Sequence, residues 1–80
     1  MPLTRPIDPG DFVKAVFKNE ATGEVERMWV KVDRADEGNR LVFGKLDSQP
    51  LVNRELQLGM ELAVAFDAIC EHIKDAEFNQ

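Results

Sequence analysis

Residues 25–32, Val-Glu-Arg-Met-Trp-Val-Lys-Val, decide the fold of this chain. Their apolar side chains recur at every second position, 28, 30 and 32, while Arg27, Trp29 and Lys31 fall on the opposite side. A period of two is typical of a half-buried β-strand, a conformation that β-branched and aromatic residues favour. The pattern therefore predicts a strand with one side toward the core and one side formed by Arg27, Trp29 and Lys31.

Two more strands are predicted beside this one. Residues 12–18 are rich in Phe and Val, and the turn-forming stretch 19–24 joins them to residues 25–32, which together predict a β-hairpin. The polar stretch 33–39 ends in Gly-Asn and predicts a second hairpin loop, followed by a third strand over residues 40–46. Gly44 inside that strand indicates a bulge, a bend or the close approach of another backbone.

The C-terminal third of the chain is ambiguous. Residues 60–66 alternate as a strand does, but apolar residues between Leu62 and Ile73 also fall at helical spacing. We predict a strand over 60–66 and a short helix or turn over 67–76 capped by Asp67, with one continuous helix as the alternative. Residues 50–58 fit neither period and predict a helical turn or covering loop that ends at Gly59.

These elements predict a single small α+β domain over residues 10–80, preceded by a Pro-rich lead-in arm over residues 1–9. Its sheet is a four-stranded, strongly twisted antiparallel meander, a form that includes SH3-like folds, with the covering segment and a short C-terminal helix. A chain of 80 residues has no second lobe to close a cleft, so any functional surface is a patch or a small groove.

Three stretches carry a family resemblance: residues 26–32, residues 44–50, and Leu58-Gly59 with Ile69. Together they resemble a bacterial family of small uncharacterised domains called YegJ-like, over about residues 11–74. The resemblance implies a twisted antiparallel sheet with short helical pieces, and it implies no established activity. The chain departs from the family after the isoleucine, where Glu71-His72 stands in place of an Asp-Trp pair.

Charge limits the possible partners. Ten Lys and Arg against fifteen Asp and Glu give a net charge of −5, which argues against a general binder of nucleic acid backbones. Residues 60–80 hold five acidic residues and one lysine, so much of the acidity lies in the C-terminal segment. Glu71 and Asp75 in that segment are candidate partner-binding residues, suited to a basic partner.

The residue types and their spacing indicate neither a catalytic site nor a metal site. Cys70 and His72 stand two apart with no second Cys or His, so they predict no metal site, and we expect Cys70 to be a small buried residue and His72 to lie at the surface or rim. The carboxylate pairs lie in polar turns or on solvated faces, and the glycines form no phosphate-binding loop. We therefore expect no enzyme activity and no cofactor; a small hydrolase using Asp67, Glu71 and Asp75 is the third alternative.

The most suggestive feature is the side of the strand formed by Arg27, Trp29 and Lys31. A Trp between basic residues can be part of the core, can anchor a protein partner, or can stack on single-stranded nucleic acid. Of these readings the core is favoured for Trp29 itself. For the function, the leading hypothesis is a non-enzymatic module that binds a protein partner through this sheet face or through its acidic C-terminal segment, with a nucleic-acid-associated accessory domain as the alternative.

The expected setting follows from the same residues. One Cys cannot form an intrachain disulfide, which suits a reducing cytoplasm, and no apolar run is long enough for a signal or a membrane span. We expect a cytoplasmic protein without a membrane partner. The edges of an open sheet allow either a monomer or a homodimer that pairs through an edge strand.

Overall fold

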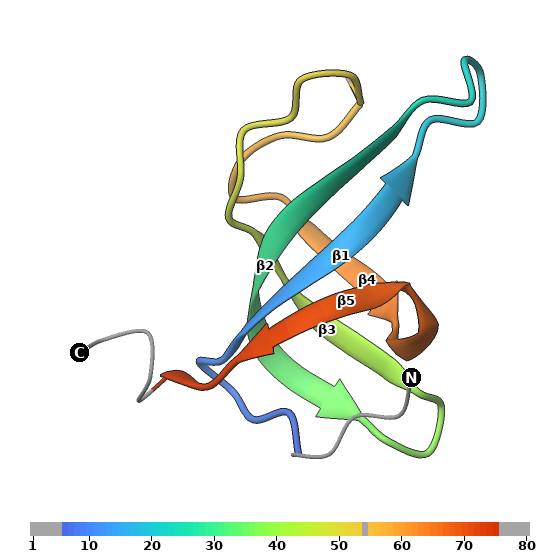
Figure 1. Ribbon diagram of the computed structural model, residues 1–80. Helices are drawn as coiled ribbons and strands as arrows, with labels where there is room; N and C mark the ends of the chain where they lie inside the picture. The colour runs from blue at the N-terminus through green and yellow to red at the C-terminus, as the bar shows by residue number, and fades with distance from the viewer. Residues whose placement is uncertain (1–5, 54, 76–80) are drawn as a thin grey trace.

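The computed structural model describes residues 6–53 and 55–75, and it shows one curled antiparallel sheet (Figure 1). Its strands are β1 (Phe12–Lys18), β2 (Val25–Asp36), β3 (Leu41–Leu46), β4 (Glu61–Ala65) and β5 (Ile69–Ile73). A single 3₁₀ turn, η1 (Phe66–Ala68), joins the last two strands. The strand order is β4-β3-β2-β1-β5, so the last strand of the chain returns to lie beside the first.

The predicted strands over residues 12–18, 25–32, 40–46 and 60–66 are confirmed with small shifts at their ends. The strand β2 runs four residues further than its pattern predicts, to Asp36, because a register shift between Val32 and Arg34 lets it keep pairing with β3. Such a bulge bends the strand and increases its twist. This bend allows one long strand to follow the curl of the sheet.

The short helix or turn predicted over residues 67–76 is wrong beyond Ala68, and so is the alternative of one continuous helix; residue 76 lies outside the described residues. Residues 69–73 form the fifth strand β5, which pairs antiparallel with β1, and Asp67 makes no cap hydrogen bond to the 3₁₀ turn. The outer edge of β1 offers a row of backbone donors and acceptors that a short, Ile-containing segment can satisfy. Pairing with that edge outweighs the helical spacing, since short isolated helices are marginal. The four-stranded count is corrected with it.

The segment between β3 and β4 is a loop without a helix in its described residues. Glu26 of β2 anchors it: the carboxylate accepts hydrogen bonds from the N–H groups of Leu51, Val52 and Asn53 at 2.9 to 3.1 Å. These bonds, led by the one from Leu51, lower the pKa of Glu26. The loop extends from the same end of the sheet as the 19–24 turn (Figure 1), and Asn19 Nδ2 donates to the Val52 carbonyl at 3.2 Å.

The core lies on the concave side of the sheet. The largest fully buried apolar side chains come from the three central strands: Val13, Val30, Val32, Val42 and Leu46. Ile7, which belongs to the predicted lead-in arm, packs in the same cluster, and residues 1–5 of that arm lie outside the described residues. Within the described residues no helix is long and apolar enough to cross a membrane.

Candidate functional site

The outward face of the β1–β2 hairpin is the first candidate site. Its four cross-strand pairs are Phe12 with Lys31, Lys14 with Trp29, Val16 with Arg27, and Lys18 with Val25. In every pair an apolar side chain stands opposite a cation, and no carboxylate belongs to the set. We call these eight residues the hairpin face. Because side chains alternate along each strand, the core residues Val13 and Val30 point to the other side.

Trp29 lies on this face and is half-buried, contrary to the core interpretation. Its backbone is fixed by the segment that follows β3: the Trp29 N–H donates to Ser48 Oγ at 2.9 Å, and the Trp29 carbonyl accepts from the Asp47 N–H at 2.8 Å. The ammonium of Lys14 stands 5.6 Å from the centre of the indole ring. The ring is therefore held in place and shares its surface with a cation.

Lys14 also connects Trp29 with a second predicted residue. Its Nζ lies 3.8 Å from Glu71 Oε1 of β5, which pairs with Lys14 across the strands. The structure thus brings Trp29 and Glu71 to one surface, with Lys14 between them. Sequence reasoning placed these two residues in separate surfaces because it expected a helix over residues 67–76.

Three cations of the hairpin face point to solvent: Lys18, Arg27 and Lys31. Within the described residues none of them has a carboxylate oxygen within 4.0 Å, although Lys31 stands 5.9 Å from the Phe12 ring. Lys45 of β3 lies directly opposite Lys31, but its Nζ is 3.2 Å from Asp33 Oδ2, so its charge is already paired. The sheet face is therefore cationic on a molecule whose net charge is −5.

Three acidic residues in the described part of the C-terminal segment, Asp67, Glu71 and Asp75, have different neighbours. Glu71 is paired with Lys14 as described, and Asp67 lies 3.3 Å from Arg40 at the turn between β2 and β3. Asp75 stands near the lead-in arm, where its N–H donates to Asp11 Oδ1 at 3.0 Å. The structure thus distributes the predicted acidic candidates over three places.

A buried polar cluster around Asp11 was missed by the sequence analysis. Asp11 is 2% exposed, and its carboxylate accepts hydrogen bonds from the Asp8 N–H, Lys74 Nζ and the Asp75 N–H at 2.9 to 3.0 Å, with His72 Nε2 at 2.8 Å. Burial raises the pKa of Asp11, but these hydrogen bonds outweigh burial and hold it well below its usual range. The cluster ties the arm to the end of β5.

Cys70 is exposed where a buried position was predicted, and the His72 side chain is more buried than a surface or rim position implies. Cys70 is exposed at the register shift between β5 and β1, and its Sγ donates to the Lys14 carbonyl at 3.3 Å. The His72 side chain is only 7% exposed because it packs against Asp11. Among the described residues no group of three or more His, Cys, Asp or Glu side chains could hold a metal ion.

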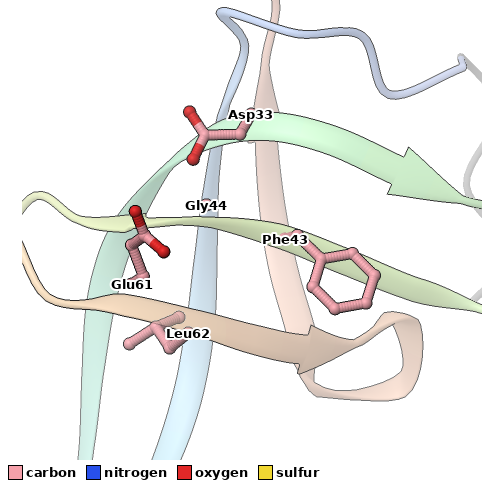
Figure 2. A pocket seen from close by; sticks show the side chains of 5 residues that line it. All are labelled: Asp33, Phe43, Gly44, Glu61 and Leu62. Atoms are coloured by element: carbon pink, nitrogen blue, oxygen red, sulfur yellow. The ribbon is translucent and has the colours of Figure 1, made fainter.

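A shallow hollow crosses strands β2, β3 and β4 (Figure 2). It has a volume of about 260 Å³ and is lined by Asp33, Phe43, Gly44, Glu61 and Leu62. Its charged and aromatic walls already have partners: Lys45 Nζ lies 3.2 Å from Asp33, and the Arg34 guanidinium lies 4.0 Å from the centre of the Phe43 ring. The hollow therefore offers little to a ligand beyond Glu61 and the Leu62 side chain.

Two of the three stretches that carry the family resemblance meet in the structure. Residues 26–32 and 44–50 are joined by the bonds from Trp29 to Asp47 and Ser48, and Gly44 packs against the backbone of Lys31. Much of this motif therefore has a structural role at the β2–β3 junction. Comparison of the chain with protein-family models, curated proteins and solved structures found no match.

Proposed function

We propose that this chain is a non-enzymatic interaction domain that binds an acidic segment of a protein partner through the hairpin face. One observation carries the proposal: all four cross-strand pairs of that face combine an apolar side chain with a Lys or Arg. The exposed Val16 and Val25 supply apolar contact area for affinity. The unpaired cations Lys18, Arg27 and Lys31 select an acidic partner. An extended segment in which acidic and apolar side chains alternate fits this arrangement.

A protein partner is favoured over nucleic acid by the aromatic content of the face. Proteins that bind single strands stack successive bases on exposed aromatic rings. Here Phe12 is 6% exposed, and Trp29 is half-buried with Lys14 over its ring. The acidity of the molecule adds long-range repulsion toward a polyphosphate chain. A nucleic-acid-associated role remains the second candidate because the row of cations on the face would suit a phosphate backbone.

The fold type, the family and the cellular location are proposed together with this function. The return of β5 to the edge of β1 in a curled five-stranded sheet supports an SH3-like barrel, a scaffold that hosts many binding functions. Membership of the YegJ-like family and a cytoplasmic location are proposed on the motifs and the single cysteine given above.

The proposal is tested by titrating the protein with a synthetic peptide of alternating Glu and Val and following backbone amide shifts by NMR. We expect shifts concentrated on β1 and β2. Arg27→Gln should weaken binding about fivefold, as expected for the loss of one exposed ion pair. The matched control Arg40→Gln, which removes an exposed arginine at the far turn, should bind as the unaltered protein does.

Two results would contradict the proposal. Equal weakening by both Arg→Gln variants would show that only net charge matters. Tighter binding of an oligothymidylate than of the peptide at the same low ionic strength would favour the nucleic acid candidate instead.

A further inference from the structure

We infer that β4 is a homotypic docking edge: two copies of this chain associate by antiparallel pairing of their β4 strands about Ala63. The inference is independent of the hairpin face, which lies on β1 and β2. It begins with the two edges of the sheet, since β4 and β5 are the outer strands and no other strand of the described chain pairs with their outer sides.

The edge at β5 carries the features that prevent strand addition. A register shift at Cys70 interrupts the ladder, and exposed Glu71 stands beside it. The arm also reaches this side, because Lys74 Nζ donates to the Pro6 carbonyl at 3.1 Å and to Asp8. Bulges and charges are common ways in which natural proteins protect an edge strand.

The edge at β4 has no register shift, and its one charged residue, Glu61, stands at the first position of the strand. Its register with β3 is continuous from Glu61 to Ala65, and it contains no Lys, Arg or Pro. The exposed residues Ala63 and Ala65 are small and present no obstacle to another backbone. The preceding residue Met60 is 39% exposed, so apolar surface continues beyond the start of the strand.

The hydrogen-bond pattern fixes which residues can pair. The Met60 carbonyl accepts from Leu46 and the Phe66 N–H donates to Arg40, so the even-numbered residues of this segment bond toward β3. By the alternation of an antiparallel ladder, the backbone groups of Glu61, Ala63 and Ala65 point away from the sheet. These are the donors and acceptors that a second strand would use.

A two-fold axis at Ala63 uses all three of these residues. It places Ala63 opposite its own copy and Glu61 opposite Ala65 of the second copy, so no two like charges face each other. The same register brings exposed Met60 opposite half-buried Phe66. A shift that centres the pair on Glu61 would instead oppose two carboxylates, which is unfavourable. One short strand buries less area than a stable dimer interface needs, so the association is expected to depend on concentration.

The experiment measures the oligomeric state of the full chain by sedimentation equilibrium over a range of concentrations. We expect a reversible monomer–dimer equilibrium. Ala63→Lys places two lysines opposite each other at the axis and should raise the dimer dissociation constant about tenfold or more. Ala21→Lys adds the same charge in the exposed 19–24 turn and should leave the constant unchanged.

A cysteine pair tests the register. In a Cys70→Ser background, Ala63→Cys should form an intermolecular disulfide under mild oxidation, because paired residues lie about 5.5 Å apart between Cα atoms. Ala65→Cys should not, since its two copies would be separated by four residues along the strands, about 14 Å. A protein that stays monomeric at all concentrations, a dimer unaffected by Ala63→Lys, or equal cross-linking at positions 63 and 65 would overturn the inference.

Discussion

Gly44 shows how one residue controls the approach of two strands. A Cβ atom at this position would lie 2.2 Å from the Lys31 carbonyl oxygen and 2.9 Å from Cγ1 of Val30. The first of these is a backbone atom of the neighbouring strand, which cannot move without disturbing the β2–β3 ladder. Of the three roles that Gly44 suggested in the sequence, the close approach of another backbone is the one that this contact shows.

Gly44→Ala should therefore destabilise the protein by about 1–3 kcal/mol, the usual cost of overpacking. Gly38→Ala is the matched control, because its nearest neighbour would be Asp36 Oδ1 at an ordinary 3.5 Å. Urea unfolding followed by tryptophan fluorescence measures both changes. Equal stability of the two variants would show that β2 and β3 can separate at no cost, contrary to this explanation.

Residue-level reasoning from the sequence succeeded where alternation alone decides exposure. Positions 27 and 31 face away from the core as predicted, whereas Trp29, for which the core was favoured, lies half-buried on the same face. It failed for Cys70 and His72, because their exposure depends on a register shift in β5 and on the distant partner Asp11. Neither feature has a local signal that a single sequence could reveal.

At the scale of elements, the β3–β4 loop depends on a side chain of another strand. The Glu26 carboxylate accepts hydrogen bonds from the backbone N–H groups of residues 51–53 and from Nδ2 of Asn53, the last at 3.0 Å. The sequence predicted a covering segment here but not its attachment, because a glutamate within a strand pattern gives no sign that its partners lie 25 residues further along the chain.

Glu26→Gln should release this loop, since an amide has one acceptor oxygen where the carboxylate has two and turns its NH₂ group toward other donors. We expect faster hydrogen exchange at the amides of Leu51, Val52 and Asn53, while exchange in β1 stays unchanged. Glu24→Gln in the exposed 19–24 turn is the control. Unaltered protection at residues 51–53 would mean that the loop is held by other contacts.

The strand β5, like the β3–β4 loop, depends on a partner from another part of the chain. Its residues carry both a helical spacing and enough β-forming side chains for a strand, so local preference is nearly balanced. The unpaired edge of β1 decides between them, and that edge exists only after the hairpin has formed. The fifth strand was therefore beyond the reach of a local pattern, whereas the four preceding strands were not.

At the scale of the whole molecule, the Asp11 cluster joins the beginning of the domain to its end. Asp11 binds Asp8 in the arm and binds His72, Lys74 and Asp75 at the end of β5, across more than sixty residues of sequence. Its folded pKa lies below the unfolded value, so the carboxylate stabilises the fold fully above about pH 4 and less as the pH falls further.

Asp11→Asn should therefore lower the free energy of unfolding by about 3 kcal/mol near pH 7, as expected when one partner of a buried charged cluster is removed. The difference in free energy of unfolding between the variant and the unaltered protein should shrink as the pH is lowered from 5 toward 3. Over this range the stabilisation that the ionised Asp11 carboxylate gives to the unaltered protein decreases. Urea unfolding at several pH values measures this. A difference that stays constant down to pH 3 would contradict the assigned role of the charge.

The sequence by itself determined a small β-rich domain, four of its strands and the outward position of Arg27 and Lys31, because alternation and turn residues act over a few neighbours. Only the tertiary structure decided the fifth strand, the attachment of the β3–β4 loop to Glu26, the Asp11 cluster and the meeting of Trp29 with Glu71 through Lys14. Each of these depends on groups that are distant in sequence and become neighbours only when the sheet curls and its last strand joins the first.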